Sequence, residues 1–176
     1  MPASKLRNLF LICSSLMISI ESYAKIDLEK GNVVTLVGSG MGSRMVHYGH
    51  FETEIFLRFP NADLTIRNLC DEGNTPGFRP HPSRNQEEQY AFPGAKELIH
   101  DSLKANTKPK GHFPTPDQWL ADLKTDVVLC FFGFNSSFDG PGQAGRFKKE
   151  LDAYVKHLNS MSVSYTHLRA HETDSY

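Results

Sequence analysis

The chain has 176 residues, of which 39% are hydrophobic and 22% are charged, and its formal net charge is −1. This composition is ordinary for a folded globular domain, and it excludes a disordered chain or a fibre. The near-neutral balance also excludes the large basic excess that nucleic-acid-binding domains use. We therefore expect neither a nucleic-acid partner nor electrostatic attachment to a membrane surface.

Residues 1–24 have the pattern of an export signal. Lys5 and Arg7 give a positive start, and residues 9–20 form an apolar stretch that is short for a membrane span. Ser22 and Ala24 place small residues where a signal peptidase reads. The pattern predicts export to the periplasm or beyond, with no membrane span after signal removal. The alternative is an N-terminal helix of the core.

The C-terminal segment 163–176 has a different origin in our interpretation. Residues 163–173 read Val-Ser-Tyr-Thr-His-Leu-Arg-Ala-His-Glu-Thr, which resembles a translated transposase-type sequencing adapter. Adapter-derived residues do not belong to a fold, so His167 and His171 are not candidate site residues. Residues 25–162 then form the native domain. We expect segment 163–176 to pack poorly, the sheet to lack its last strands, and the intact protein to have further domains downstream.

Strands and helices alternate from the start of this domain. Residues 33–37 are an apolar run that opens onto Gly38-Ser39-Gly40, which is typical of a buried strand ending in a tight turn. Residues 50–59 carry apolar side chains at four-residue spacing and precede Pro60, which predicts an amphipathic helix ending there. Residues 64–67 alternate apolar and polar side chains, so they predict a second strand.

The second half continues the alternation after a long loop. Residues 69–92 are rich in Gly, Pro, Asn and Arg and predict a loop of a length that is usually either functional or poorly ordered. A helix is expected over residues 94–104, and Thr115 with Gln118 predicts a capping box that starts another. Residues 127–132 predict a third buried strand. The last expected helix, over residues 145–158, has four apolar side chains on one face: Phe147, Leu151, Val155 and Leu158.

This order of elements predicts an α/β fold with a flavodoxin-like, doubly wound parallel sheet and the first strand in the middle. In such sheets ligands bind beyond the carboxyl ends of the strands. The turns after the three strands are therefore the candidate site, and they should bring Ser39, Gly73 and Asn135 to one rim. Cys130 lies within the third apolar run and is interpreted as a small buried residue, not as half of a disulfide.

These turns resemble the sequence blocks of the SGNH, or GDSL-like, hydrolases. That family has a Gly-Asp-Ser nucleophile turn, a second-block Gly and a Gly-X-Asn block that supply oxyanion donors, and a C-terminal Asp-X-X-His. Here residues 68–75 look like the second block with Gly73 as its glycine, and Gly133-Phe134-Asn135 matches the third. The likeness covers residues 32–158 and is greatest to divergent N-terminal domains of large exported bacterial proteins. It implies hydrolysis of a carbohydrate or lipid ester through an acyl-enzyme, without a metal or organic cofactor.

The first block departs from the family pattern. With Gly38 on the family glycine, Ser39 stands where Asp is expected and Gly40 stands where the nucleophilic Ser is expected. Ser39 is therefore a shifted candidate nucleophile, and Gly73 and Asn135 are candidate oxyanion donors. The alternative is that Ser39 only caps the next segment and that the domain is a non-catalytic ligand-binding or interaction module. Arg79, His81 and Arg84 in the long loop are candidates to hold an anionic or sugar substrate, or are simply solvated. Asn74 beside them is a further candidate to bind the small-molecule or glycan ester.

Dinucleotide binding is an alternative from another class. The glycine-rich turn over residues 38–43 follows a strand, as a phosphate-binding turn does. The third glycine would however be due at Ser43, and the second strand ends at Asn68 without an acid for a ribose. His47 and His50 have a spacing that some metal sites use, but no third ligand is evident, so no metal is expected.

Overall fold

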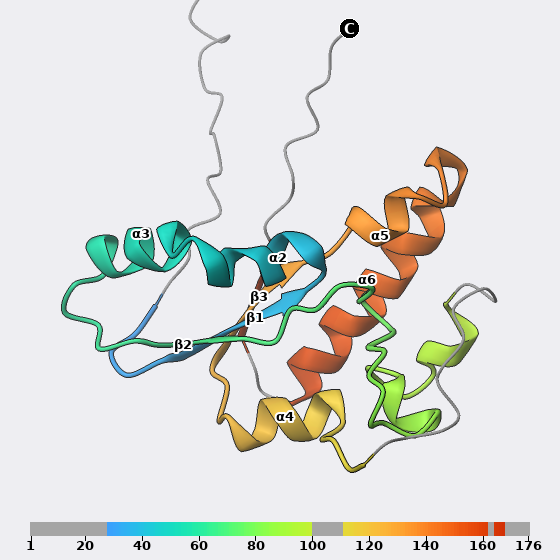
Figure 1. Ribbon diagram of the computed structural model, residues 1–176, viewed down its shortest axis with the longest axis horizontal. Helices are drawn as coiled ribbons and strands as arrows, with labels where there is room; N and C mark the ends of the chain where they lie inside the picture. The colour runs from blue at the N-terminus through green and yellow to red at the C-terminus, as the bar shows by residue number, and fades with distance from the viewer. Residues whose placement is uncertain (1–27, 100–110, 162–163, 168–176) are drawn as a thin grey trace, which may run out of the picture.

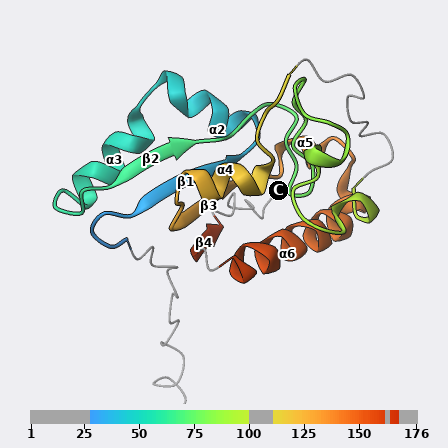
Figure 2. The ribbon, with the colours of Figure 1, turned by 90° about the horizontal axis from the view of Figure 1, so that it is seen from below.

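The computed structural model describes residues 28–99, 111–161 and 164–167, so the predicted signal at residues 1–24 lies outside the described residues. At its centre is a parallel sheet with the strand order β2-β1-β3-β4. Figure 2 shows β2, β1 and β3 side by side, with β4 beyond β3. The strands are β1 (Val33–Gly38), β2 (Thr65–Asn68), β3 (Val127–Phe131) and β4 (Ser164–His167). The three predicted strands and the central place of the first are confirmed.

Helices cover both faces of this sheet (Figure 1). They are α2 (Gly40–Arg44), α3 (His50–Arg58), α4 (Pro116–Asp122), α5 (Phe134–Ser137) and α6 (Ala144–Ser160). Successive side chains of a strand point to opposite faces, so β3 contributes to two cores. Leu129 packs with Ile55 of α3 on one face, whereas Val128 and Cys130 pack with Leu158 of α6 on the other. In the part of the chain that the structure describes, no helix combines the length and apolar character needed to cross a membrane.

Helix α4 begins as the sequence predicts. The Thr115 Oγ1 accepts a hydrogen bond from the Gln118 amide at 3.2 Å, and the Gln118 side chain accepts one from the Thr115 amide at 3.0 Å. Two amides that the first helical turn leaves without partners are thereby satisfied. This capping box fixes the residue at which α4 begins.

The predicted apolar face of α6 is confirmed at Leu158, but the other buried side chains of the helix lie one position before the predicted ones. The side chains that α6 buries are Glu150, Tyr154 and Leu158, while Phe147 and Leu151 are only partly buried. Glu150 is tolerated inside because its carboxylate accepts hydrogen bonds from two loop donors. An apolar pattern cannot reveal a buried carboxylate, so it placed the face too far round the helix.

The helix expected over residues 94–104 is also not formed as predicted. Gly94 has a φ of +83°, and only a short 3-10 turn, η3 (Ala95–Glu97), follows it. Residues 100–104 lie outside the described residues. Ala95 is fully buried against the core, so tertiary packing in place of helix propensity holds this turn.

The expectation that segment 163–176 packs poorly is wrong for residues 164–167. These form β4, which pairs with β3 in parallel from Val127 opposite Ser164 to Cys130 opposite His167. Without it, β3 would be an edge strand with unpaired backbone groups. Pairing of backbone groups needs no apolar face, and α6 returns the chain to that edge by a crossover connection. The rest of the segment is outside the described residues.

Candidate functional site

The turns after the three predicted strands meet at one edge of the sheet. The connections from β1 and β3 lead to strands on opposite sides, and such a switch of direction opens a crevice in parallel sheets. The Asn74 side chain donates to the Gly38 carbonyl at 3.0 Å, and the Asn135 side chain donates to the Asn74 carbonyl at 2.9 Å. These two hydrogen bonds join the three turns, which we refer to as the rim.

The first turn presses against β3. Gly38 has a φ of +150°, and a Cβ there would lie 2.3 Å from the Phe131 carbonyl oxygen, so only glycine fits. Ser39 is fully buried, and both its amide (2.9 Å) and its hydroxyl (3.3 Å) donate to that same carbonyl. Ser39 occupies the N-cap position of α2, but its side chain makes no capping bond. Its hydroxyl therefore points inward, neither capping the helix nor facing the rim.

The second turn presents a backbone donor. Gly73 is exposed with a φ of +87°, and its amide donates to no acceptor among the described residues. Asn74 beside it is 4% exposed because its side chain holds the first turn. Gly73 thus keeps the free amide that the predicted oxyanion role needs.

A carboxylate that the sequence analysis missed anchors this second turn. Glu150 of α6 is buried and accepts from the Thr75 hydroxyl at 2.5 Å and from the Gly77 amide at 2.6 Å. Hydrogen bonds to an ionised acceptor are stronger than neutral ones. The only sequence signal is its place four residues before Tyr154, which means something only once the buried face of α6 is known.

The third turn supplies a side-chain donor. Gly133, with a φ of +118°, starts the short helix α5, and Asn135 follows half-buried. The Asn135 amide group carries two hydrogens, of which the bond to Asn74 uses one. The second is available to a ligand at the rim.

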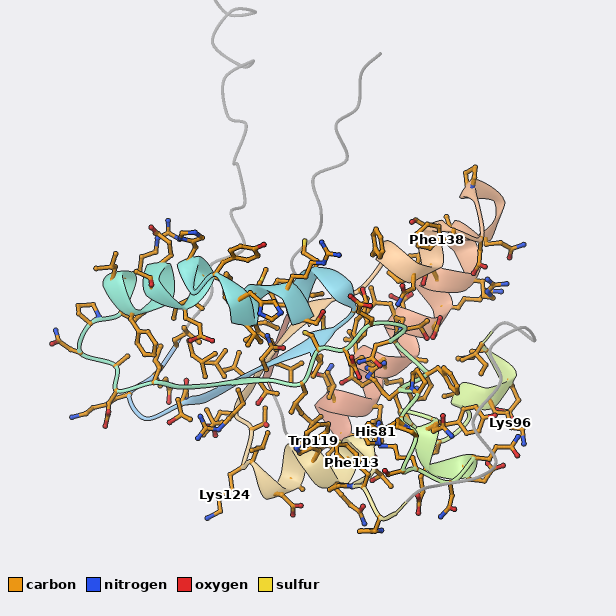
Figure 3. The ribbon with its side chains drawn as sticks, viewed as in Figure 1. His81, Lys96, Phe113, Trp119, Lys124 and Phe138 are labelled. Carbon is orange, nitrogen blue, oxygen red and sulfur yellow. The ribbon has the colours of Figure 1, made fainter. Side chains whose placement is uncertain are left out.

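A cavity of about 150 Å³ adjoins the rim, between the long loop and α4. It is lined by all four residues predicted to bind substrate: Asn74, Arg79, His81 and Arg84. Arg79 and Arg84 are buried, so the alternative of a solvated loop is wrong for them. Phe113 and Trp119, which the sequence analysis did not single out, form a wall of the same cavity. Figure 3 shows His81, Phe113 and Trp119 close together beside α4.

The His81 ring is fixed in this wall by an aromatic neighbour and by one hydrogen bond. Its ring stacks on Phe113 with 3.7 Å between centroids, and its Nδ1 accepts from the Ser83 amide at 3.2 Å. Burial, and then the charge of Arg84, lower the pKa of His81 below its usual value. An imidazole that accepts at Nδ1 carries its proton on Nε2, so it is a donor and not a base at that atom.

Both cysteines of the domain are free thiols. Cys130 is fully buried, as predicted, and burial raises its pKa to about 12. Burial also raises the pKa of Cys70 to about 12. Because the thiolate is the reactive form, neither thiol is a nucleophile at neutral pH.

The histidines considered for metal binding are exposed, and the glycine-rich turn considered for nucleotide binding packs against the second strand. Within residues 28–99, 111–161 and 164–167, no group of three His, Cys, Asp or Glu side chains could hold a metal ion. His47 and His50 are both exposed. In the glycine-rich turn, the Asn68 side chain donates to the Gly42 carbonyl at 2.8 Å, so this turn packs on the second strand.

Comparison with models of known protein families gave no match for this chain, and a search of curated proteins gave none either.

Proposed function

We propose that residues 25–162 are an exported SGNH-type domain that binds a carbohydrate or lipid ester at the rim without turning it over. The observation that carries the proposal is the pair of hydrogen bonds that joins the three turns through Asn74. They bring Asn135 beside the second turn with its exposed Gly73 amide. Two such donors suit the carbonyl oxygen of an ester.

Binding without turnover follows from the surroundings of Ser39. Acyl transfer needs a hydroxyl that faces the substrate and lies beside a base. The Ser39 hydroxyl instead donates to the Phe131 carbonyl and has no exposed surface. Among the described residues, no imidazole or carboxylate is hydrogen-bonded to it. A ligand at the rim therefore meets the donors but not the Ser39 hydroxyl.

Ester hydrolysis is the second candidate function. It is favoured by the same two donors, since donors of this kind also stabilise the oxyanion that forms during acyl transfer. In this case the first turn shifts so that Ser39 leaves Phe131 and faces the rim. The two candidates differ in one respect that can be measured, which is whether Ser39 is needed for turnover.

The test uses the full chain with p-nitrophenyl acetate and p-nitrophenyl butyrate for hydrolysis, and acetylated xylo-oligosaccharides for binding by isothermal titration calorimetry. We expect hydrolysis at background, unchanged in Ser39→Ala, and saturable binding that Asn135→Ala weakens. Ser137→Ala is the matched control. Ser137 lies in the third turn with Asn135, and its exposed hydroxyl donates to the Phe134 carbonyl. Circular dichroism checks that each variant is folded.

Turnover that Ser39→Ala abolishes would replace the binding proposal with the hydrolase. In that case removing one oxyanion donor by Asn135→Ala should lower the rate about 10²- to 10³-fold. The absence of both turnover and binding, for esters of sugars and of fatty acids alike, would contradict both candidates.

A further inference from the structure

The cavity between the long loop and α4 contains two buried cations. We propose that it binds a small organic oxyanion, a carboxylate or sulfate group carried on a ring, through Arg79 and Arg84. This inference goes beyond the proposed function and does not rest on it. The groups that would bind the anion are side chains of the loop, whereas the rim uses the Gly73 amide and Asn135.

Arg79 lines the cavity, and one of its buried donors lacks a hydrogen-bond partner among the described residues. The side chain is 5% exposed, and its Nη2 has no hydrogen-bond partner among the described residues. Its guanidinium carbon lies 4.5 Å from the centre of the Phe132 ring and 5.0 Å from that of Tyr154. Its Nη1 donates only a long bond, 3.4 Å, to the Phe78 carbonyl. Buried donors are normally satisfied, so this one indicates a missing acceptor.

Arg84 is built more firmly into the same wall. It is 3% exposed, its Nε donates to the Pro114 carbonyl at 2.7 Å, and its Nη1 donates to the Arg79 carbonyl at 3.0 Å. Its guanidinium also lies over the rings of Phe113 and Trp119, at 5.1 and 5.7 Å from their centres. These contacts fix its position before any ligand arrives, which is the preorganisation that tight binding needs.

No carboxylate of the described residues forms an ion pair with either guanidinium group, and Glu88 and Asp71 act on Arg84 only from a greater distance. None of the ion pairs within these residues includes Arg79 or Arg84. Asp71 lines the cavity but is exposed, and its side chain accepts from the Glu72 amide. Burial, with the nearby charge of Arg79, lowers the pKa of Arg84 to about 10, so Arg84 remains charged at neutral pH. Buried charges are normally paired, and an anionic ligand would supply the pair.

The walls indicate what carries the anion. His81, Phe113 and Trp119 form a stack of rings along one side, with Phe113 edge-on to Trp119 at 4.8 Å. Flat rings, including sugar rings with their C–H faces, pack against aromatic surfaces of this kind. A guanidinium group can donate two parallel hydrogen bonds to two oxygens of a carboxylate or sulfate. The cavity thus fits an aromatic or sugar acid better than a bare inorganic ion.

Trp119 makes the proposal directly testable, because it is the only tryptophan in the chain and it lines the cavity. Its fluorescence in the full chain is titrated with glucuronate and with benzoate, at constant ionic strength. Glucose and benzyl alcohol are the matched neutral probes, and sodium sulfate is the competitor. We expect a saturable change with at least one of the two acids, displacement by sulfate, and no saturable change with the neutral probes. If neither acid saturates, or if a neutral probe binds as well as its acid, the proposal is overturned.

Two arginine variants distinguish binding of the acid in the cavity from non-specific electrostatic attraction of the acid to the protein surface. Arg79→Met keeps the length of the side chain and removes the charge, so it should weaken binding of the acid at least about tenfold. Arg58→Met removes an exposed cation on α3, on the other face of the sheet, and should leave binding unchanged. Equal affinity in Arg79→Met and the unchanged chain would overturn the proposal. If Arg79→Met does not fold, Arg79→Lys replaces it, since a lysine lacks the fork and should also bind more weakly.

Asn135→Ala distinguishes failure of this inference from failure of the proposed function. It removes a rim donor but no group of the cavity, so acids should still bind to it. Loss of acid binding in Asn135→Ala, with the fold intact, would mean that the rim and not the cavity holds the anion.

Discussion

Replacing Glu150 tests the link between α6 and the second turn. In Glu150→Ala the Thr75 hydroxyl and the Gly77 amide lose their acceptor while remaining buried. Hydrogen bonds to a carboxylate contribute about 1.5–3 kcal/mol each, and in the variant the two buried donors find no water to replace it. Part of this is recovered, because the variant no longer has to desolvate a carboxylate. We therefore expect a loss of about 3 kcal/mol in the free energy of unfolding.

The assay is urea denaturation followed by circular dichroism, with thermal melting alongside it. For a domain of this size, about 3 kcal/mol corresponds to a fall of roughly 10 °C in Tm. Glu150→Gln keeps an acceptor oxygen in place and should lose only about 1 kcal/mol. Asp152→Ala is the matched control on the same helix, because Asp152 is exposed and its pairing with Lys148 contributes less than about 1 kcal/mol.

A double-mutant cycle isolates the bond itself. Thr75→Val removes one donor, so its effect should be smaller in the Glu150→Ala background by about 1–2 kcal/mol. If Glu150→Ala is no less stable than Asp152→Ala, or if the two changes are additive, the carboxylate does not anchor the turn and the reasoning is refuted.

Three further predictions concern other parts of the fold. Gly42→Ala should lower the free energy of unfolding, measured by urea denaturation, by about 1–3 kcal/mol, because its new Cβ would lie 2.3 Å from the Cys70 sulfur. Gly145→Ala is the control, since a Cβ there meets nothing within 4 Å, and it should be neutral or up to about 1 kcal/mol more stable. Thr115→Ala removes the cap of α4 and should lose about 1 kcal/mol, and an unchanged denaturation midpoint would contradict the capping role. The raised thiol pKa values of Cys70 and Cys130 mean that the unfolded chain, with pKa 9.0, releases these protons before the folded one, near 12. The stability they contribute is present below pH 9 and falls as the pH rises towards 12, so the urea midpoint should decline over that range and decline less in Cys130→Ala.

The strands and their order were predictable because they depend on short-range patterns. Three apolar runs separated by helical patterns leave few arrangements in a parallel sheet, and β1, β2 and β3 have the predicted one. The start of α4 was predictable for a similar reason, since Thr115 and Gln118 satisfy each other locally. Local rules hold where the residues that obey them are neighbours in the chain.

The missed features depend on contacts between distant segments. Glu150 is buried because two residues of the long loop donate to it, Thr75 and Gly77, which lie 75 and 73 residues earlier in the chain. The direction of the Ser39 hydroxyl depends on a carbonyl of β3, at Phe131. Strand β4 pairs with the free edge of β3, and no sequence pattern within segment 163–176 predicts this pairing. In each case the deciding partner lies on another element, so no window of sequence contains the information.

The geometry of the first turn separates what the fold needs from what catalysis would need. The fold needs Gly38, which packs on the Phe131 carbonyl and whose own carbonyl accepts from Asn74. It does not need glycine at position 40, because a Cβ there would meet nothing closer than the Glu72 Cγ at 3.9 Å. This is the position where the resemblance to SGNH hydrolases leads us to expect the nucleophilic serine, and the structure has room for it. Its absence is therefore not forced by packing. The two hydrogen bonds that join the turns of the rim involve neither residue 40 nor a hydroxyl. The rim can therefore keep its ligand donors when the nucleophile is lost, which is the condition that a binding module of this fold requires.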